Sequence, residues 1–256
     1  MIELEAKAVL LDIEGTTSST KYVYDVLFPF ARQNARSYLE RCWDEKNTLE
    51  ACDLIAKEIG FDSSYEWLHG EEKRSDMIDK VMVAVEKLMD DDSKSTGLKE
   101  LQGFIWAEAY SSGLLCSQVF VDVPQALACW KATGLLMAIY SSGSATAQRV
   151  FFRHTEFGDL SDYFAGFFDT SCGAKKESTS YARIANLLSY KPEEIVFFSD
   201  SVDELNAAMQ AKMQTVLLLR PDNAEQPGSD HPSIPTFYDI RIQQPGSGLN
   251  GQEEIE

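Results

Sequence analysis

Apolar residues along this chain form two kinds of pattern, short continuous runs and longer stretches with helical spacing. The short runs are rich in β-branched or aromatic residues, which is typical of strands buried in a parallel sheet. Helical patterns such as 179–188 and 202–211 separate the later runs, and such strand–helix alternation favours an α/β fold with a doubly wound parallel sheet. We expect four strands and a weaker fifth candidate, at residues 8–11, 135–140, 195–198, 215–219 and, for the fifth, 164–168.

A long helical stretch interrupts this alternation between the first two expected strands. Its segments carry apolar residues at i, i+3 and i+4, and they lie at 22–39, 47–59, 75–89 and 98–110. We therefore expect residues 21–115 to form a helical domain inserted into a core made of 1–20 and 116–242. The tail from 243 to 256 is rich in Gly, Pro, Gln and Glu, which predicts disorder.

Charge and cysteine usage narrow the class of protein. Forty-one acidic residues against 23 Lys and Arg give a net charge of −18, which disfavours nucleic acid and anionic membranes as partners. No apolar run approaches the ~20 residues that span a bilayer, and the acidic N-terminus lacks the pattern of a secretory signal. The five cysteines are scattered without a C-x-x-C pair, which argues against disulfides or a zinc site. We expect a soluble, cytoplasmic protein in a reducing compartment.

Two acids follow the first expected strand. Asp12 and Glu14 come directly after an apolar run, and Gly15 with two threonines indicates the turn that ends it. A carboxylate at the tip of a buried strand is costly unless something pairs with it. Two interpretations remain open on this segment alone: a solvated strand end with a helix cap, or a nucleophilic carboxylate beside a metal ion.

Polar residues also end two of the later strands. Ser141 and Ser142 begin a polar segment that leads into a helix near residue 145, and Asp200 follows the strand at 195–198. Ligands of open α/β sheets bind beyond the carboxyl ends of the strands. The serines and free N–H groups can bind an anion, or a serine can simply cap the helix. Asp200 can supply an oxygen ligand to a hard cation such as Mg²⁺.

Further candidates lie just before or inside the helices. Lys175 precedes a helix and could neutralise a phosphoryl group and Asp12 together, although Lys175 and Lys176 could equally be a solvated pair. Asp203 and Glu204 follow Asp200 closely.

Further segments of the chain also match a known set of motifs: 11–19, 22–30, Leu101-Gln102-Gly103 with Trp106, 139–144 with Gln148, 168–170, and Lys175 with Glu177, Ser178 and Tyr181. Taken together, these motifs resemble those of the haloacid dehalogenase superfamily and, more closely, of the enolase-phosphatase E1 family within it. The resemblance covers nearly all of residues 6–240. Glu14, where most phosphatases of the superfamily carry Asp, is itself a mark of the E1 family. Ser201, Cys172 and Lys176 are mild departures from the family pattern.

The resemblance implies roles for the candidate residues. Asp12 would be the nucleophile of an aspartyl-phosphate mechanism. One Mg²⁺ would be held by an Asp12 oxygen, the Glu14 main-chain carbonyl and Asp200. Ser141, the Ser142 backbone N–H and Lys175 would bind the phosphate. Glu204, rather than Asp203, would orient the metal shell or Lys175.

The resemblance also implies an activity: conversion of 5-(methylthio)-2,3-dioxopentyl phosphate to an acireductone and phosphate, in methionine salvage. Glu14 would serve as acid and base in the enolisation, with Mg²⁺ or Lys175 polarising the diketone. The helical insertion would act as a lid on a monomer. Its large side chains are expected to form its own core rather than a pocket for the methylthio group: Met77, Met82, Met89, Trp106 and Tyr110.

Three alternatives remain. The first is a Mg²⁺-dependent phosphatase or phosphomutase acting on a sugar phosphate. The second is a metal-independent dehalogenase, which would not use a second acid at position 14. The third is a binding module that has kept the fold without catalysis. Such a module usually loses the nucleophile or the metal-binding Asp, whereas Asp12, Ser141, Lys175 and Asp200 are all present.

Overall fold

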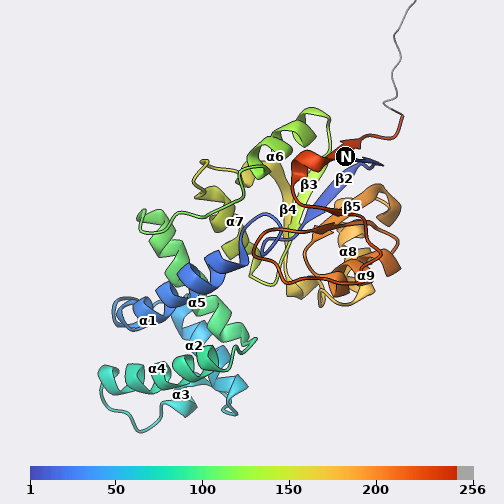
Figure 1. The fold of residues 1–256 in the computed structure, drawn as a ribbon. Coiled ribbons are helices and arrows are strands. Elements are labelled where there is room, and N and C mark those ends of the chain that lie inside the picture. Colours follow the sequence, from blue (N-terminus) through green and yellow to red (C-terminus); the bar gives the residue numbers. More distant parts are fainter. Residues whose placement is uncertain (247–256) are drawn as a thin grey trace, which may run out of the picture. The chain divides into compact units, whose positions relative to one another are not determined.

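The computed structural model describes residues 1–246, and a six-stranded sheet forms the core of one of its two compact units (Figure 1). All neighbouring strands are parallel, in the order β4-β3-β2-β5-β6-β7. The five expected strands are all present, within one residue of their predicted ends. The strands of this sheet are β2 (Ala8–Leu11), β3 (Leu136–Tyr140), β4 (Phe164–Phe168), β5 (Ile195–Ser199), β6 (Gln214–Leu218) and β7 (Ser233–Ile234).

Helices cover both faces of this sheet. On one face, Leu10 and Phe197 pack in a cluster with Tyr181 of α8 (Ser178–Leu188) and with residues of α9 (Val202–Gln210). On the other face, the Trp130 ring of α6 (Val123–Ala132) stacks on Phe198 with centroids 5.9 Å apart. Residues Ala8–Leu11 of β2 are fully buried because helices cover the sheet on both sides. The predicted doubly wound α/β fold is confirmed. One further helix, α7 (Ala145–Arg153), and four short 3₁₀ turns complete this part: Ser161–Tyr163, Thr170–Cys172, Pro192–Glu194 and Phe237–Asp239.

A second, two-stranded sheet was not expected from the sequence. It pairs β1 (Ile2–Glu5) with β8 (Ile240–Gln243) in parallel. Disorder therefore does not begin at Gln243, since this residue ends β8 and the Gln244 side chain donates a hydrogen bond to the Gly134 carbonyl at 2.7 Å. The remainder of the predicted tail, 247–256, lies outside the described residues.

Residues 22–115 form a separate compact unit, and the rest of the described chain forms the other. Met82 is buried in the hydrophobic core of this unit, and Met77 and Met89 pack against that core, as expected. The predicted helix at 22–39 is divided: a π-helical segment leads into α1 near Pro29, whose ring nitrogen has no hydrogen to donate. The helices of the unit are the π-helix Tyr22–Leu27, α1 (Phe28–Cys42), α2 (Lys46–Glu58), α3 (Ser64–Trp67), α4 (Arg74–Asp90) and α5 (Thr96–Ser111).

Within residues 1–246, every helix is too short or too polar to span a bilayer.

Candidate active site

The candidate site lies where the sheet changes its winding direction. Strands β2 and β5 are neighbours, and the Asp12 N–H extends their pairing by donating to the Phe198 carbonyl at 3.0 Å. The chain leaves β2 toward β3 on one side and leaves β5 toward β6 on the other. In open α/β sheets, such a switch point leaves a crevice beyond the carboxyl ends of the strands. Asp12 and Ser199 therefore lie side by side at the carboxyl ends of β2 and β5.

Asp12 is held by three donors. Its side chain is buried, with Oδ1 accepting the Ile13 N–H at 2.7 Å and lying 2.7 Å from Lys175 Nζ. The hydroxyl of Ser199 lies 3.1 Å from the other oxygen, Oδ2. These contacts fix the orientation of the Asp12 side chain.

Lys175 lies between two carboxylates. Its Nζ is 2.7 Å from Asp12 Oδ1 and 2.7 Å from Glu204 Oε2, and its side chain is only 10% exposed. Burial lowers the pKa of Lys175, but the charges of Asp12, Glu204 and Glu14 outweigh it, so the pKa is raised and the ammonium keeps its charge. The Tyr181 hydroxyl donates to the Lys175 carbonyl at 2.7 Å, which fixes the backbone here. Lys175 is therefore not one of a solvated pair.

Lys176 and Asp203 pair with each other on the surface instead. The two side chains form an ion pair at 2.7 Å and are 70% and 64% exposed. Of the two acids that follow Asp200, it is Glu204 that lies in the candidate site.

Ser199 links Asp12 to Glu204. Its Oγ lies 3.0 Å from Glu204 Oε2 as well as close to Asp12, and it accepts the Ser201 N–H at 3.1 Å. Burial, and next the Asp12 charge, raise the pKa of Glu204 to about 8. One hydroxyl hydrogen can bond only one carboxylate at a time. The sequence placed Ser199 at a strand end, but its side chain was not among the predicted site residues.

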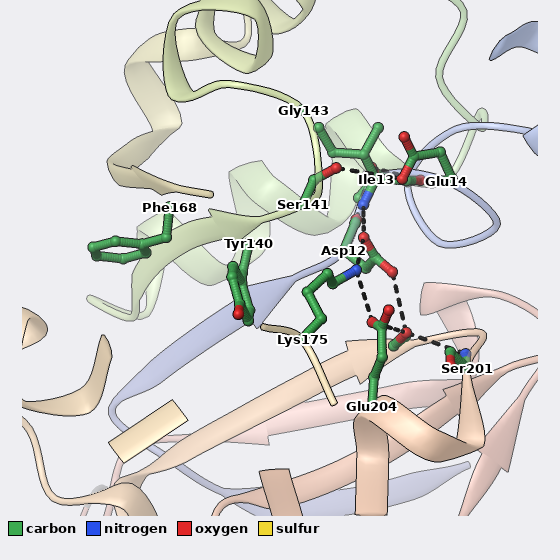
Figure 2. A network of polar contacts seen from close by, with 12 residues as sticks. Asp12, Ile13, Glu14, Tyr140, Ser141, Gly143, Phe168, Lys175, Ser201 and Glu204 are labelled. Atoms are coloured by element: carbon green, nitrogen blue, oxygen red, sulfur yellow. Dashed lines mark hydrogen bonds and ion pairs between the residues drawn. The ribbon is translucent and has the colours of Figure 1, made fainter. Parts of the chain in front are cut away.

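Glu14 and Ser141 meet on the other side of Asp12. Ser141 Oγ donates to Glu14 Oε2 at 3.3 Å (Figure 2), and the Ser141 N–H donates to the Phe168 carbonyl, extending the β3–β4 pairing. Burial, and next the Asp12 charge, raise the pKa of Glu14. A raised pKa makes this carboxylate a better proton acceptor than an ordinary one.

The serines of the polar segment after β3 have different roles. Ser144 caps α7, with its Oγ accepting the Ala147 N–H at 3.3 Å, whereas Ser142 is exposed. Gln148 shapes the segment, because its Nε2 donates to the Gly143 carbonyl at 2.6 Å and to the Phe168 carbonyl at 2.8 Å. The capping interpretation therefore applies to Ser144 and leaves Ser141 beside Glu14.

The oxygen atoms near Gly15 suit a hard cation. Gly15 has φ +68°, and a Cβ there would collide with the Asp200 carboxylate, so Asp200 lies directly against the turn after Asp12. Burial, and next the Asp12 charge, raise the pKa of Asp200 to about 7. Within residues 1–246, no hydrogen-bond donor reaches the Glu14 main-chain carbonyl. Two carboxylates and a free carbonyl are the kind of oxygen donors that Mg²⁺ takes together with water.

In the part of the chain that the structure describes, no three His, Cys, Asp or Glu side chains are arranged to hold a metal ion. The predicted set needs only the side chains of Asp12 and Asp200, since its third member is a main-chain carbonyl. The donor set therefore fits Mg²⁺, which usually keeps several waters.

Comparison with known proteins identifies the class. A family model described as haloacid dehalogenase-like hydrolase matches residues 6–212, and the chain belongs to this family. The crystal structure of the UTR4 protein of Saccharomyces cerevisiae has a TM-score of 0.72 at 28% identity, covering 91% of this chain and 98% of that one. The crystal structure of CbbY of Rhodobacter sphaeroides, with xylulose-(1,5)bisphosphate, has a TM-score of 0.54 at 14% identity and shares the fold.

Curated relatives narrow the class to the enolase-phosphatase E1 family. The protein of that name from Sorangium cellulosum is 42% identical over 240 residues, which are 94% of this chain and 99% of its own length. The one from Drosophila melanogaster is 41% identical over 222 residues, covering 87% of this chain and 86% of the relative. Within the haloacid dehalogenase-like hydrolases, the chain is a member of the enolase-phosphatase E1 family.

Proposed function

We propose that the protein is a Mg²⁺-dependent enolase-phosphatase that converts 5-(methylthio)-2,3-dioxopentyl phosphate to an acireductone and phosphate, in methionine salvage. The observation that carries this proposal is the buried arrangement of Asp12, Lys175 and Glu204, with Glu14 and Ser141 beside it. The membership of the enolase-phosphatase E1 family supports the choice of substrate.

Asp12 is the proposed nucleophile. One of its oxygens attacks phosphorus, and the bond from phosphorus to the substrate oxygen breaks, which leaves an aspartyl-phosphate. Water then attacks this phosphorus and regenerates the carboxylate, so that one difficult hydrolysis is divided into two displacements. The Ile13 N–H and Lys175, both 2.7 Å from Oδ1, fix the attacking group.

The site contains more acidic than basic side chains, so a bound cation would offset its negative charge. The acids Asp12, Glu14, Asp200 and Glu204 face a single ammonium, that of Lys175. Asp12, the Glu14 carbonyl and Asp200 would hold one Mg²⁺, which would supply positive charge to the phosphoryl oxygens. Lys175 and the Ser141 hydroxyl, with the Ser142 N–H, would bind the remaining phosphate oxygens.

Glu14 is the proposed acid and base of the enolisation. Its carboxylate would take a proton from C1 of the substrate, next to the C2 carbonyl, and return a proton to the enolate oxygen. The Ser141 hydroxyl, 3.3 Å from Oε2, orients the carboxylate. The raised pKa of Glu14 makes it a stronger base than an ordinary carboxylate.

Hydrogen exchange in D₂O tests whether Asp12 serves phosphoryl transfer and Glu14 serves enolisation. We expect Asp12→Asn to release no phosphate while NMR still shows deuterium entering C1 of the diketone phosphate. Adding Glu14→Gln to this variant should abolish the exchange, whereas adding Asp203→Asn, at a surface acid, should not. Full exchange without Glu14 would remove it as the base, and loss of exchange in Asp12→Asn alone would tie enolisation to Asp12.

The helical unit of residues 22–115 is proposed to act as a lid that excludes water from the reaction. We further propose that the protein works as a cytoplasmic monomer. Both statements rest on the resemblance to the enolase-phosphatase E1 family.

A further inference from the structure

Arg220 is a buried cation that the proposed reaction does not use. It is the second residue beyond β6, at the same edge of the sheet as Asp12, and it is only 5% exposed. Its Nε and Nη2 both donate to the Thr16 carbonyl, at 3.0 and 2.9 Å. Because a planar guanidinium donates two bonds in a fixed fork, it fixes the direction of this carbonyl as well as its position.

Asp122 and two aromatic rings hold Arg220 in place. Nη1 lies 2.9 Å from Asp122 Oδ2, and both side chains are almost fully buried. The guanidinium carbon lies 4.2 Å from the centroid of the Phe120 ring and 5.0 Å from that of Phe237. Asp122 Oδ2 also accepts the Phe237 N–H at 2.6 Å. These contacts therefore hold the Arg220 side chain in place independently of its hydrogen bonds to Thr16.

Asn223 donates a hydrogen bond to the carbonyl of Gly15, the residue before Thr16. Its Nδ2 donates to the Gly15 carbonyl at 2.8 Å and to the Leu218 carbonyl at 3.0 Å. The short segment that follows β6 thus binds two successive carbonyls of the turn after Asp12, those of Gly15 and Thr16.

Among the described residues, none donates a hydrogen bond to the Glu14 carbonyl, in contrast to its neighbours in the turn. The Gly15 N–H, which belongs to the same peptide group, donates to the Ser18 carbonyl at 2.8 Å. Because N–H and C=O point in opposite directions across a trans peptide, the Glu14 carbonyl faces away from the turn. The neighbouring carbonyls all accept hydrogen bonds: those of Asp12, Ile13, Gly15, Thr16 and Thr17.

We propose that Arg220, held by Asp122 and assisted by Asn223, is a positioning residue that fixes the turn after Asp12 so that the Glu14 carbonyl is aimed at the metal. This inference rests on the proposed function, because it assumes that the carbonyl is a ligand. Groups that orient metal ligands typically change metal affinity by about 10- to 100-fold when they are removed.

Mn²⁺ binding without substrate tests this role. Free Mn²⁺ is followed by electron paramagnetic resonance during a titration of the wild-type protein and of Arg220→Lys, which keeps the charge but loses the fork. We expect Arg220→Lys to weaken Mn²⁺ binding by about ten-fold or more. Asn223→Ala, which removes the donor to Gly15 at a partly exposed position, should weaken it in the same direction. Arg241→Lys, at an exposed arginine paired with Glu3, is the matched control and should bind as the wild type does.

The outcomes separate this role from a general effect on folding. A lower melting temperature for Arg220→Lys with wild-type Mn²⁺ affinity would overturn the proposal, as would wild-type affinity in a folded Asn223→Ala if Arg220→Lys does not fold. A wild-type protein that binds no Mn²⁺ would overturn the metal site itself, and with it this inference. Weakened binding in the Arg220 and Asn223 variants, with the Arg241 variant unchanged, supports the proposal.

Discussion

Lys175 and Lys176 are neighbours in the sequence but lie in different environments. Lys175 is enclosed with Asp12 and Glu204, whereas Lys176 pairs with Asp203 at the surface. A buried ammonium that contacts the nucleophile stabilises charge in the transition state far more than a solvated one. Variants at these two adjacent positions therefore compare a buried lysine with a solvated one.

We expect Lys175→Met to lower kcat by at least about a hundred-fold, because it removes the cation shared by Asp12 and Glu204. The kcat of Lys176→Met should stay within about two-fold of the wild-type value, since exposed ion pairs contribute little to stability. Steady-state phosphate release measures both, with circular dichroism to show that each variant is folded. Comparable losses in the two variants would contradict the assigned role of Lys175.

Side chains that directly follow a strand were predictable, and those that reach the site from elsewhere were not. Asp12, Ser141 and Asp200 follow β2, β3 and β5, so the rule on carboxyl ends places them together. Arg220 directly follows the expected strand at 215–219, so the same rule could have placed it at this edge, whereas Asn223 carries no such signal. The partners of both side chains lie about two hundred residues earlier in the chain. Only the folded chain shows that they bind the turn after Asp12.

At the scale of elements, the segment between β6 and β7 is held by a buried histidine. His231 Nδ1 lies 2.8 Å from Thr215 Oγ1 of β6, and its Nε2 lies 3.2 Å from Asn206 Oδ1 of α9. Burial lowers the pKa of His231, although the neighbouring Asp230 opposes this. The segment that it holds also contains Arg220 and Asn223.

The lowered pKa of His231 predicts how stability depends on pH. The folded state favours the neutral ring, so this contribution is present above the unfolded pKa of about 6.5 and is lost as pH falls through the folded value. Urea unfolding of wild type and His231→Gln, compared at each of several pH values, should therefore show the variant's deficit shrinking below that point. His69→Gln, at an exposed histidine, is the control. A deficit that grows on acidification would contradict this sign.

The elements missed from the sequence are those whose stability depends on a distant partner. Strand β1 is four residues long with alternating exposure, and its partner β8 lies at the other end of the described chain. Strand β7 has only two residues. The continuous apolar runs of β2 and β5 were predictable because burial on both faces requires apolar residues at every position.

At the scale of the whole molecule, a protein with a net charge of −18 must bind an anionic substrate. Repulsion at long range slows encounter, while Lys175 and the proposed Mg²⁺ attract the phosphoryl group at short range. Salt screens the first effect more than the second, because exposed charges are screened more than buried ones.

We therefore expect kcat/KM at saturating Mg²⁺ to rise modestly as the ionic strength is increased from about 10 mM to about 150 mM. A series with KCl, checked against a second salt to exclude specific ion effects, measures this. A fall in kcat/KM over this range would indicate that the substrate is attracted by the overall field rather than repelled by it.

One site is proposed both to enolise and to dephosphorylate the diketone phosphate. Phosphate release and the ultraviolet absorbance of the enol phosphate intermediate, recorded together on a single sample, test this most directly. We expect a transient absorbance of the enol phosphate, followed by acireductone and stoichiometric phosphate, with phosphate release abolished by EDTA and restored by Mg²⁺. Phosphate release from a panel of sugar phosphates, with none from the diketone phosphate, would contradict it.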